Sequence, residues 1–171
     1  MVISSPRTAT HYMIDYISPK TQLPLIENQG FLVTSGGEKF PLVNSIPRFV
    51  PNDNYAAAFG LQWQTFKKTQ LDSHVGIPVT RERVERCLGQ KISDLANKNI
   101  LEVGCGAGRF TELLVEGNAN VHALDLSNAV EVNLHNIGTR PNYKVAQASV
   151  YEMPYPDNSF DIVFCLGVIQ H

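Results

Sequence analysis

Three glycines stand at every second position within residues 100–111, whose sequence is ILEVGCGAGRFT. Gly104, Gly106 and Gly108 follow a short apolar run and precede a segment of helical character. A strand, a glycine turn and a helix in this order often bind a nucleotide-type cofactor, because glycine leaves room for the ligand and adopts a positive φ. The same turn also arises from packing alone, so the flanking residues have to decide between the two.

The spacing of these glycines departs from the dinucleotide motif. G-x-G-x-x-G requires glycine at position 109, where this chain has Arg109. An acidic residue, Glu102, lies two positions before the first glycine, which gives the pattern E-x-G-x-G-x-G. This pattern resembles motif I of the class I S-adenosyl-L-methionine (SAM) dependent methyltransferases. The resemblance implies SAM as the cofactor and disfavours an NAD enzyme.

A second acidic residue ends the next apolar run. Asp125 lies 21 positions after Gly104 (125 − 104), about where a ribose-binding carboxylate is expected. Its two oxygens can accept hydrogen bonds from both ribose hydroxyls, and its charge would repel a 2′-phosphate, so adenosine fits and NADP does not. The alternative role is an N-cap for the following helix, which Ser127 could provide instead.

The segment after residue 148 resembles the methyltransferase segment that passes over the adenine. The family commonly has an aspartate there, whereas this chain has Ser149, and Val150 would offer its backbone N–H and an apolar surface. Asp161 is expected either to hydrogen-bond the glycine loop or to take part in chemistry. His171 falls where the family carries a histidine, so it is either a catalytic base, a substrate ligand or a residue without such a role. The cofactor-binding set that the resemblance implies, with no metal, is Glu102, Gly104, Cys105, Gly106, Gly108, Asp125, Leu126, Ser149, Val150 and Leu166.

Alternating strands and helices from residue 99 onward would position these residues. We expect strands at 100–103, 121–126, 143–148 and 160–168, with helices at 109–116 and 128–136. This alternation indicates an α/β fold, a Rossmann-like parallel sheet with helices on both faces. The family's sheet has seven strands in the order 3-2-1-4-5-7-6, and this sequence stops after the fourth. The run 162–169 would then be an unprotected edge, so we expect either a fragment or a chain that pairs there with itself or with a second chain.

The first 52 residues predict a small β-rich module. Turn signals such as Pro24 and Pro47 divide short apolar runs. The module resembles the small zinc-binding activators of tRNA and protein methyltransferases, but Ser18 and Thr21 stand where that family has cysteines. Hydroxyls are poor zinc ligands, so we expect a module without metal. The expected parts of the chain are therefore this module at 1–52, a helical linker or lid at 53–92, and a SAM-binding methyltransferase domain at 93–171.

Two helices are expected in the linker. The first, over 53–71, would place four aromatic side chains on one face: Tyr55, Phe59, Trp63 and Phe66. The second, over 80–88, would begin with Thr80 as its N-cap and end before Gly89. Its apolar face would consist of Val84, Cys87 and Leu88.

The composition restricts the possible functions. The 171 residues carry a net charge of −2 and are 43% hydrophobic, which suits a protein with a real core. The near-neutral charge argues against nucleic-acid binding, and the absence of a long apolar stretch indicates a cytoplasmic protein that does not enter a membrane. Cys87, Cys105 and Cys165 form no C-x-x-C pair, so neither a zinc knuckle nor a disulfide framework is expected, and Cys105 and Cys165 are expected to be buried.

These observations predict a SAM-dependent methyltransferase, or its cofactor-binding half, that acts on a small-molecule acceptor. The alternative is a non-catalytic SAM-binding or partner-activating module, or a truncated remnant of the enzyme.

Overall fold

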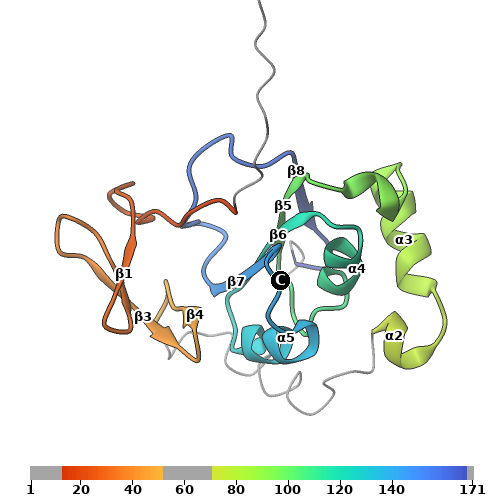
Figure 1. The fold of residues 1–171 in the computed structure, drawn as a ribbon, viewed down its shortest axis with the longest axis horizontal. Helices are drawn as coiled ribbons and strands as arrows, with labels where there is room; N and C mark the ends of the chain where they lie inside the picture. The colour runs from red at the N-terminus through yellow and green to blue at the C-terminus, as the bar shows by residue number, and fades with distance from the viewer. Residues whose placement is uncertain (1–12, 52–70, 169–171) are drawn as a thin grey trace, which may run out of the picture.

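The computed structural model describes residues 13–51 and 71–168 (Figure 1). Most of the helix expected at 53–71, with its four aromatic residues, lies outside the described residues, as does His171. In the part of the chain that is described, no helix has the length and apolar character needed to cross a membrane.

A four-stranded parallel sheet is the centre of the C-terminal region, with the strand order β7-β6-β5-β8 (Figure 1). Its strands are β5 (Asn99–Val103), β6 (Asn120–Asp125), β7 (Tyr143–Gln147) and β8 (Ile162–Cys165). In chain order this is 3-2-1-4, as the resemblance implied for the first four strands. The ladder of β8 covers only four of the nine residues expected at 160–168. Among the described residues β8 has a neighbouring strand on one side only, and Val163 in this strand is 61% exposed.

One face of this sheet is covered by helices. These are α3 (Val79–Leu88), η1 (Ile92–Leu95), α4 (Thr111–Glu116) and α5 (Ala129–Ile137). Alternate strand residues such as Ile100 and Val121 pack against Leu114 and Val130 of these helices, and all four side chains are fully buried. Every second residue of the strands thus packs against the apolar faces of the helices. This arrangement confirms the α/β class expected from the sequence.

The opposite face of the sheet meets the N-terminal module. Antiparallel strands β1 (Ile26–Asn28), β2 (Phe31–Val33), β3 (Lys39–Val43) and β4 (Ile46–Pro47) follow one another in the sheet order β1-β2-β3-β4. Leu101 and Leu124 of the parallel sheet pack in one buried cluster with Leu32, Phe49 and Tyr155. Helices were expected on both faces, and within the described ranges it is this module and the loop before β8 that cover the second face.

Ser18 and Thr21 are hydrogen-bonded within the N-terminal module. Ser18 is fully buried, and its Oγ accepts hydrogen bonds from the backbone N–H groups of Lys20 and Thr21 at 3.2 and 3.1 Å. The Thr21 hydroxyl donates to a carboxylate oxygen of Glu38. Both hydroxyls therefore have hydrogen-bond partners within the module.

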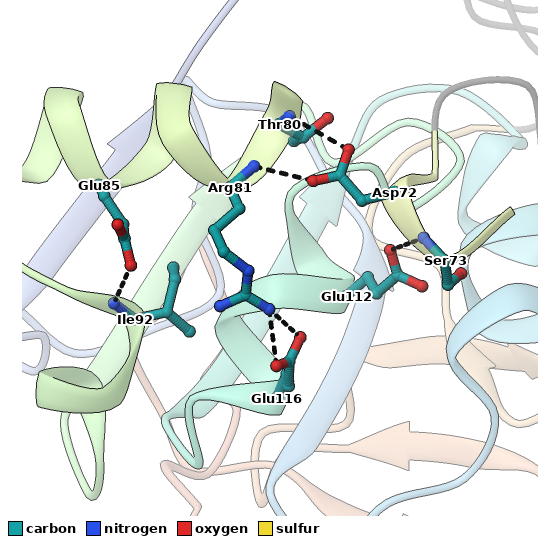
Figure 2. Close-up of polar contacts among 8 residues, drawn as sticks. All are labelled: Asp72, Ser73, Thr80, Arg81, Glu85, Ile92, Glu112 and Glu116. Carbon is teal, nitrogen blue, oxygen red and sulfur yellow. Dashed lines mark hydrogen bonds and ion pairs between the residues drawn. The ribbon is translucent and has the colours of Figure 1, made fainter. Parts of the chain in front are cut away.

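The N-terminus of α3 differs from the sequence prediction. Thr80 is the second residue of the helix rather than its N-cap, and the carboxylate of Asp72 accepts the N–H groups of Thr80 and Arg81 at 3.1 and 2.9 Å (Figure 2). Asp72 belongs to the short helix α2 (Asp72–Val75), so the cap comes from a neighbouring element. Gly89 ends the helix with φ +66°, as predicted.

Two cysteine predictions were wrong. Cys87 lies at an exposed position of α3 and is not part of its apolar face, which is formed by Val84 and the partly buried Leu88. Cys165 is only half-buried, because it ends the edge strand β8. Cys105 is buried as expected.

Candidate functional site

The glycine loop joins β5 to α4 at the carboxyl end of the sheet. Gly104, Gly106 and Gly108 have φ angles of +74°, +49° and +97°, a region that disfavours residues with a Cβ. A Cβ at Gly104 would also lie 2.0 Å from Cγ2 of Val168. The loop folds over the end of β6, because the N–H groups of Gly104 and Cys105 both donate to the Leu124 carbonyl at 2.7 and 2.9 Å. Position 104 therefore requires glycine for its backbone conformation and for its close packing.

Asp125 connects this loop to the end of β6. Its Oδ2 accepts the N–H of Gly106 at 2.9 Å, and its Oδ1 accepts the N–H and the hydroxyl of Ser127 at 2.8 and 2.7 Å. The Ser127 hydroxyl in turn accepts the N–H of Ala129, the first residue of α5, at 3.2 Å, whereas the N-cap residue of this helix is Asn128. A carboxylate can accept about four hydrogen bonds, so Asp125 has capacity for a further donor.

A network of buried, hydrogen-bonded side chains supports the glycine loop. The hydroxyl of Thr111 donates to Oε2 of Glu102 at 2.7 Å, and Thr111 Oγ1 accepts from Nδ2 of Asn133 at 3.0 Å. Tyr143 donates its hydroxyl to Oδ1 of Asn133 at 2.7 Å. We call Glu102, Thr111, Asn133 and Tyr143 the loop-support network. The network links β5, α4, α5 and β7, so four elements fix the position of the glycine loop.

Asn133 is the member that touches the loop directly. Its Nδ2 lies 3.3 Å from the carbonyl oxygens of both Cys105 and Gly106. The next turn of α5 adds Asn136, whose Nδ2 donates to the Ala107 carbonyl at 2.8 Å. Because these carbonyls face the helix, the loop's backbone is held in one orientation at three successive residues. Sequence reasoning missed both asparagines, although Asn133 interrupts an apolar helix face, a signal that could have revealed it.

Glu102 has an unusual environment for a carboxyl group. It is 1% exposed, and its Oε1 has no hydrogen-bond partner among the described residues. Burial raises the pKa of Glu102 to about 8, and the hydrogen bond from Thr111 opposes this shift while the nearby charge of Asp125 adds to it. Glu102 is therefore mostly protonated at neutral pH, and its orphaned oxygen lies beneath the glycine loop as a potential ligand atom.

Three more of the predicted residues, Ser149, Val150 and Leu166, occupy different environments. Ser149 follows β7 at the same edge as Asp125, and the two are close because the N–H of Ala148 donates to the Asp125 carbonyl at 3.0 Å. Val150 beyond it is 45% exposed. Leu166 packs, half-buried, against the core on the helical face.

The side chains of Cys105 and Asp161 are both unsuited to direct chemistry. Burial raises the pKa of the Cys105 thiol well above its usual value, so this thiol is packed and unreactive. Asp161 does not bond the glycine loop, because its Oδ2 accepts the N–H of Asn99 at 2.7 Å, at the start of β5, whereas the loop follows the end of that strand. Its role in the structure is to fasten β8 to β5.

Two cavities lie away from the glycine loop. One, of about 580 Å³, is lined by charged residues of α2, α3 and α4, including the ion pair of Arg81 with Glu116 (Figure 2). The other, of about 510 Å³, lies between the N-terminal sheet and the start of β7. The carboxyl edge remains the candidate site, because open α/β sheets bind ligands there, at the point where the strand order reverses. In this sheet that point is between β5 and β8.

The C-terminal part of the chain is similar to known proteins. A family model described as a methyltransferase domain matches residues 101–171. Ubiquinone biosynthesis O-methyltransferase from Azoarcus sp. (strain BH72) is 31% identical over 81 residues, which are 45% of this chain and 34% of the relative. The enzyme of the same name from Ralstonia nicotianae is 35% identical over 86 residues, 48% of this chain and 36% of that protein. The chain thus spans about a third of the length of these curated relatives.

A solved structure shares the fold. A protein from Methanococcus maripaludis assigned as a SAM-dependent methyltransferase superposes with a TM-score of 0.53 at 20% identity, over 71% of this chain and 54% of that one. The family model thus matches a methyltransferase domain in the C-terminal part of the chain, and the solved structure shows a similar fold.

Proposed function

We propose that the carboxyl edge of the parallel sheet binds SAM and that the protein transfers the methyl group to a small-molecule acceptor. The observation that carries this proposal is the hydrogen bond from Gly106 to Asp125, which joins the glycine loop to the carboxylate expected at the ribose. It lies within the segment that matches the methyltransferase domain.

The residues at this edge suit the chemistry of SAM. Asp125 retains capacity to accept a ribose hydroxyl. The orphaned Oε1 of Glu102 is a buried donor near the loop, because it carries the proton of the neutral carboxyl group while Oε2 accepts from Thr111. Leu126 and Val150 would add apolar contacts to the adenosine, and the Ser149 hydroxyl would accept a hydrogen bond from the adenine amine. Gly104, Cys105, Gly106 and Gly108 would leave room for the methionine end.

The chemistry of transfer needs little from the protein beyond alignment. SAM supplies a methyl group on a sulfonium, which is already activated toward a nucleophile. The protein has to orient the acceptor and provide a base where the acceptor is protonated. His171 remains our proposal for a base or acceptor ligand. The names of the curated relatives, which specify an O-methyltransferase of ubiquinone biosynthesis, support a small-molecule acceptor.

Titration calorimetry with S-adenosylhomocysteine (SAH) tests the site. Asp125→Asn retains an acceptor for Ser127 but loses the charge, so we expect SAH affinity to fall by about 1–2 kcal/mol, or roughly five- to thirtyfold. Glu27→Gln, which removes an exposed charge from β1, is the matched control and should bind like the wild type. Absence of SAH binding by the wild type would refute the proposed function, and equal binding by Asp125→Asn would remove Asp125 from the site.

A non-catalytic, partner-binding module is the second candidate, and the exposed edge at β8 favours it. Val163 is 61% exposed on a strand that has a neighbour on one side only among the described residues. Such an edge can pair with a second copy or another chain. We also propose that the N-terminal module is a zinc-free relative of the methyltransferase activators, which the local hydrogen bonds of the buried Ser18 support.

A further inference from the structure

Arg48 is a buried charged residue that connects the N-terminal module to the parallel sheet. It follows β4 directly and is 4% exposed. Its Nη1 donates to Oε1 of Gln147 at 3.2 Å, and its Nη2 forms an ion pair with Oε1 of Glu131 at 2.6 Å. One guanidinium therefore joins three elements: the end of β4, the end of β7 and the first turn of α5.

The backbone at Arg48 repeats this connection. Arg48 and Gln147 form a parallel β-bridge, and the N–H of Phe49 donates to the Gln147 carbonyl at 2.8 Å. The Phe49 ring lies 5.5 Å from that of Tyr16 and 5.0 Å from that of Phe40. Residues 48 and 49 thus pair briefly with the carboxyl end of β7, and the aromatic cluster around Phe49 stabilises this pairing.

Gln147 connects Arg48 to the proposed adenosine site. Its side chain is 1% exposed, and its Nε2 donates to the Leu126 carbonyl at 2.9 Å. In the β6–β7 ladder Gln147 lies opposite Asp125. Ser149 is two residues further along the chain. The Gln147 amide is therefore fixed by Arg48 on one side, and it fixes the backbone between Asp125 and the following helix on the other.

We propose that Arg48 is a positioning residue for the adenosine half of the cofactor site. Through Gln147 it sets the spacing between the ends of β6 and β7, where Asp125 and Ser149 would contact adenosine. The N-terminal module would then be a component of the binding site and not a separate attachment. This inference rests on the proposed function.

The two partners of Arg48 allow its positioning role to be separated from its contribution to folding. The ion pair with Glu131 faces α5 and is partly exposed, whereas the hydrogen bond to Gln147 leads to the site. Arg48→Lys retains a positive charge but cannot reach both partners with a planar fork. Gln147→Met keeps the volume but removes both amide bonds. Glu131→Gln removes only the charge of the pair and leaves the bond between Arg48 and Gln147.

The experiment measures SAH and 5′-methylthioadenosine affinity by calorimetry, together with urea unfolding, for these three variants. Arg81→Lys is the matched control, because Arg81 is paired with Glu116 away from the glycine loop. We expect Arg48→Lys and Gln147→Met to weaken both ligands by the same factor, about five- to tenfold, the effect of one hydrogen bond. An equal factor for the two ligands is expected because both contain adenosine and only SAH has the amino-acid end. Glu131→Gln and Arg81→Lys should bind like the wild type even where their unfolding midpoints fall.

The outcomes separate the two proposals. If the wild type binds SAH and Gln147→Met binds equally well, the positioning role of Arg48 is refuted while the proposed function stands. Affinity that simply follows the unfolding free energy across all four variants would also refute it. If the wild type binds neither ligand, the proposed function fails and this inference fails with it.

Discussion

Replacing Glu102 by glutamine should make the protein more stable at alkaline pH. Glutamine imitates the protonated carboxyl group, and its Oε1 can still accept the hydrogen bond that Thr111 donates to Glu102. Wild-type Glu102 is 1% exposed, so its charged form has lost nearly all contact with water. The substitution therefore removes the cost of ionising a buried group and keeps the shape of the loop-support network.

The pKa of Glu102 sets the size of this effect. The folded protein has a pKa of about 8 at Glu102, against a value of 4.5 for the unfolded chain. Between these values the native state retains a proton that the unfolded state releases, so Glu102 contributes its full stability below pH 4.5 and loses it as the pH rises toward 8. Integration gives a loss of about 1 kcal/mol at pH 5.5 and between about 4 and 5 kcal/mol at pH 8.5. The difference in unfolding free energy between the wild type and the variant should thus change by about 3 kcal/mol between pH 5.5 and pH 8.5.

Urea unfolding of both proteins at pH 5.5 and 8.5 measures this change. Every other titrating group is present in both chains, so the difference between the two proteins isolates Glu102. The unfolding free energy of the variant should increase relative to that of the wild type as the pH rises. A gap that is the same at the two pH values would show that Glu102 is ionised at neutral pH in the folded state, and the account of its environment would be wrong.

Three further results are expected. Gly117→Ala should destabilise the fold by about 1–3 kcal/mol in thermal unfolding, because its Cβ would lie 2.5 Å from the Ile92 carbonyl oxygen, whereas Gly36→Ala meets only ordinary contacts and should be nearly neutral. Elemental analysis should find no stoichiometric zinc, since Ser18 and Thr21 replace the expected ligands; one zinc per chain would contradict this. The 171-residue chain should bind SAH without multiple turnover and should self-associate through β8 in light scattering, so rapid turnover by a monomer would refute that expectation.

The elements that carry the cofactor hypothesis follow from local sequence patterns. The glycines after β5 and the acidic residue after β6 could be placed because strand ends and tight turns depend on neighbouring residues. The alternation of strands and helices predicted a parallel sheet, whereas the strand order came from the resemblance to the methyltransferase family. The predicted cap at Thr80 was wrong, because the start of this helix does not depend on its adjacent residues. Asp72, eight residues earlier, contacts the helix through the tertiary fold.

Side chains that act across the fold could not be predicted in this way. Asn133 is 28 residues from Cys105, and Arg48 is 99 residues from Gln147, so no local pattern relates these pairs. Asp161 was expected near the glycine loop, but it precedes β8, and the parallel strands β5 and β8 both start at the edge opposite to that loop, so the predicted topology already disfavoured this contact. Polar residues whose partners are distant in the chain require the three-dimensional structure.

The contact of the N-terminal module with the sheet also has a consequence for synthesis of the chain. Ile14 bonds His122 across 108 residues, the Ile14 carbonyl bonds Lys144 across 130, and Arg48 bonds Gln147 across 99. The part of the chain made first therefore cannot complete its packing until β7 has left the ribosome, which takes about 5–20 s at usual elongation rates. During that interval its apolar residues, such as Phe49, lack their partners in the parallel sheet, Leu101 and Leu124. Such long sequence separations are typical of slow folding, so co-translational protection of this segment should decide how much protein reaches the native state.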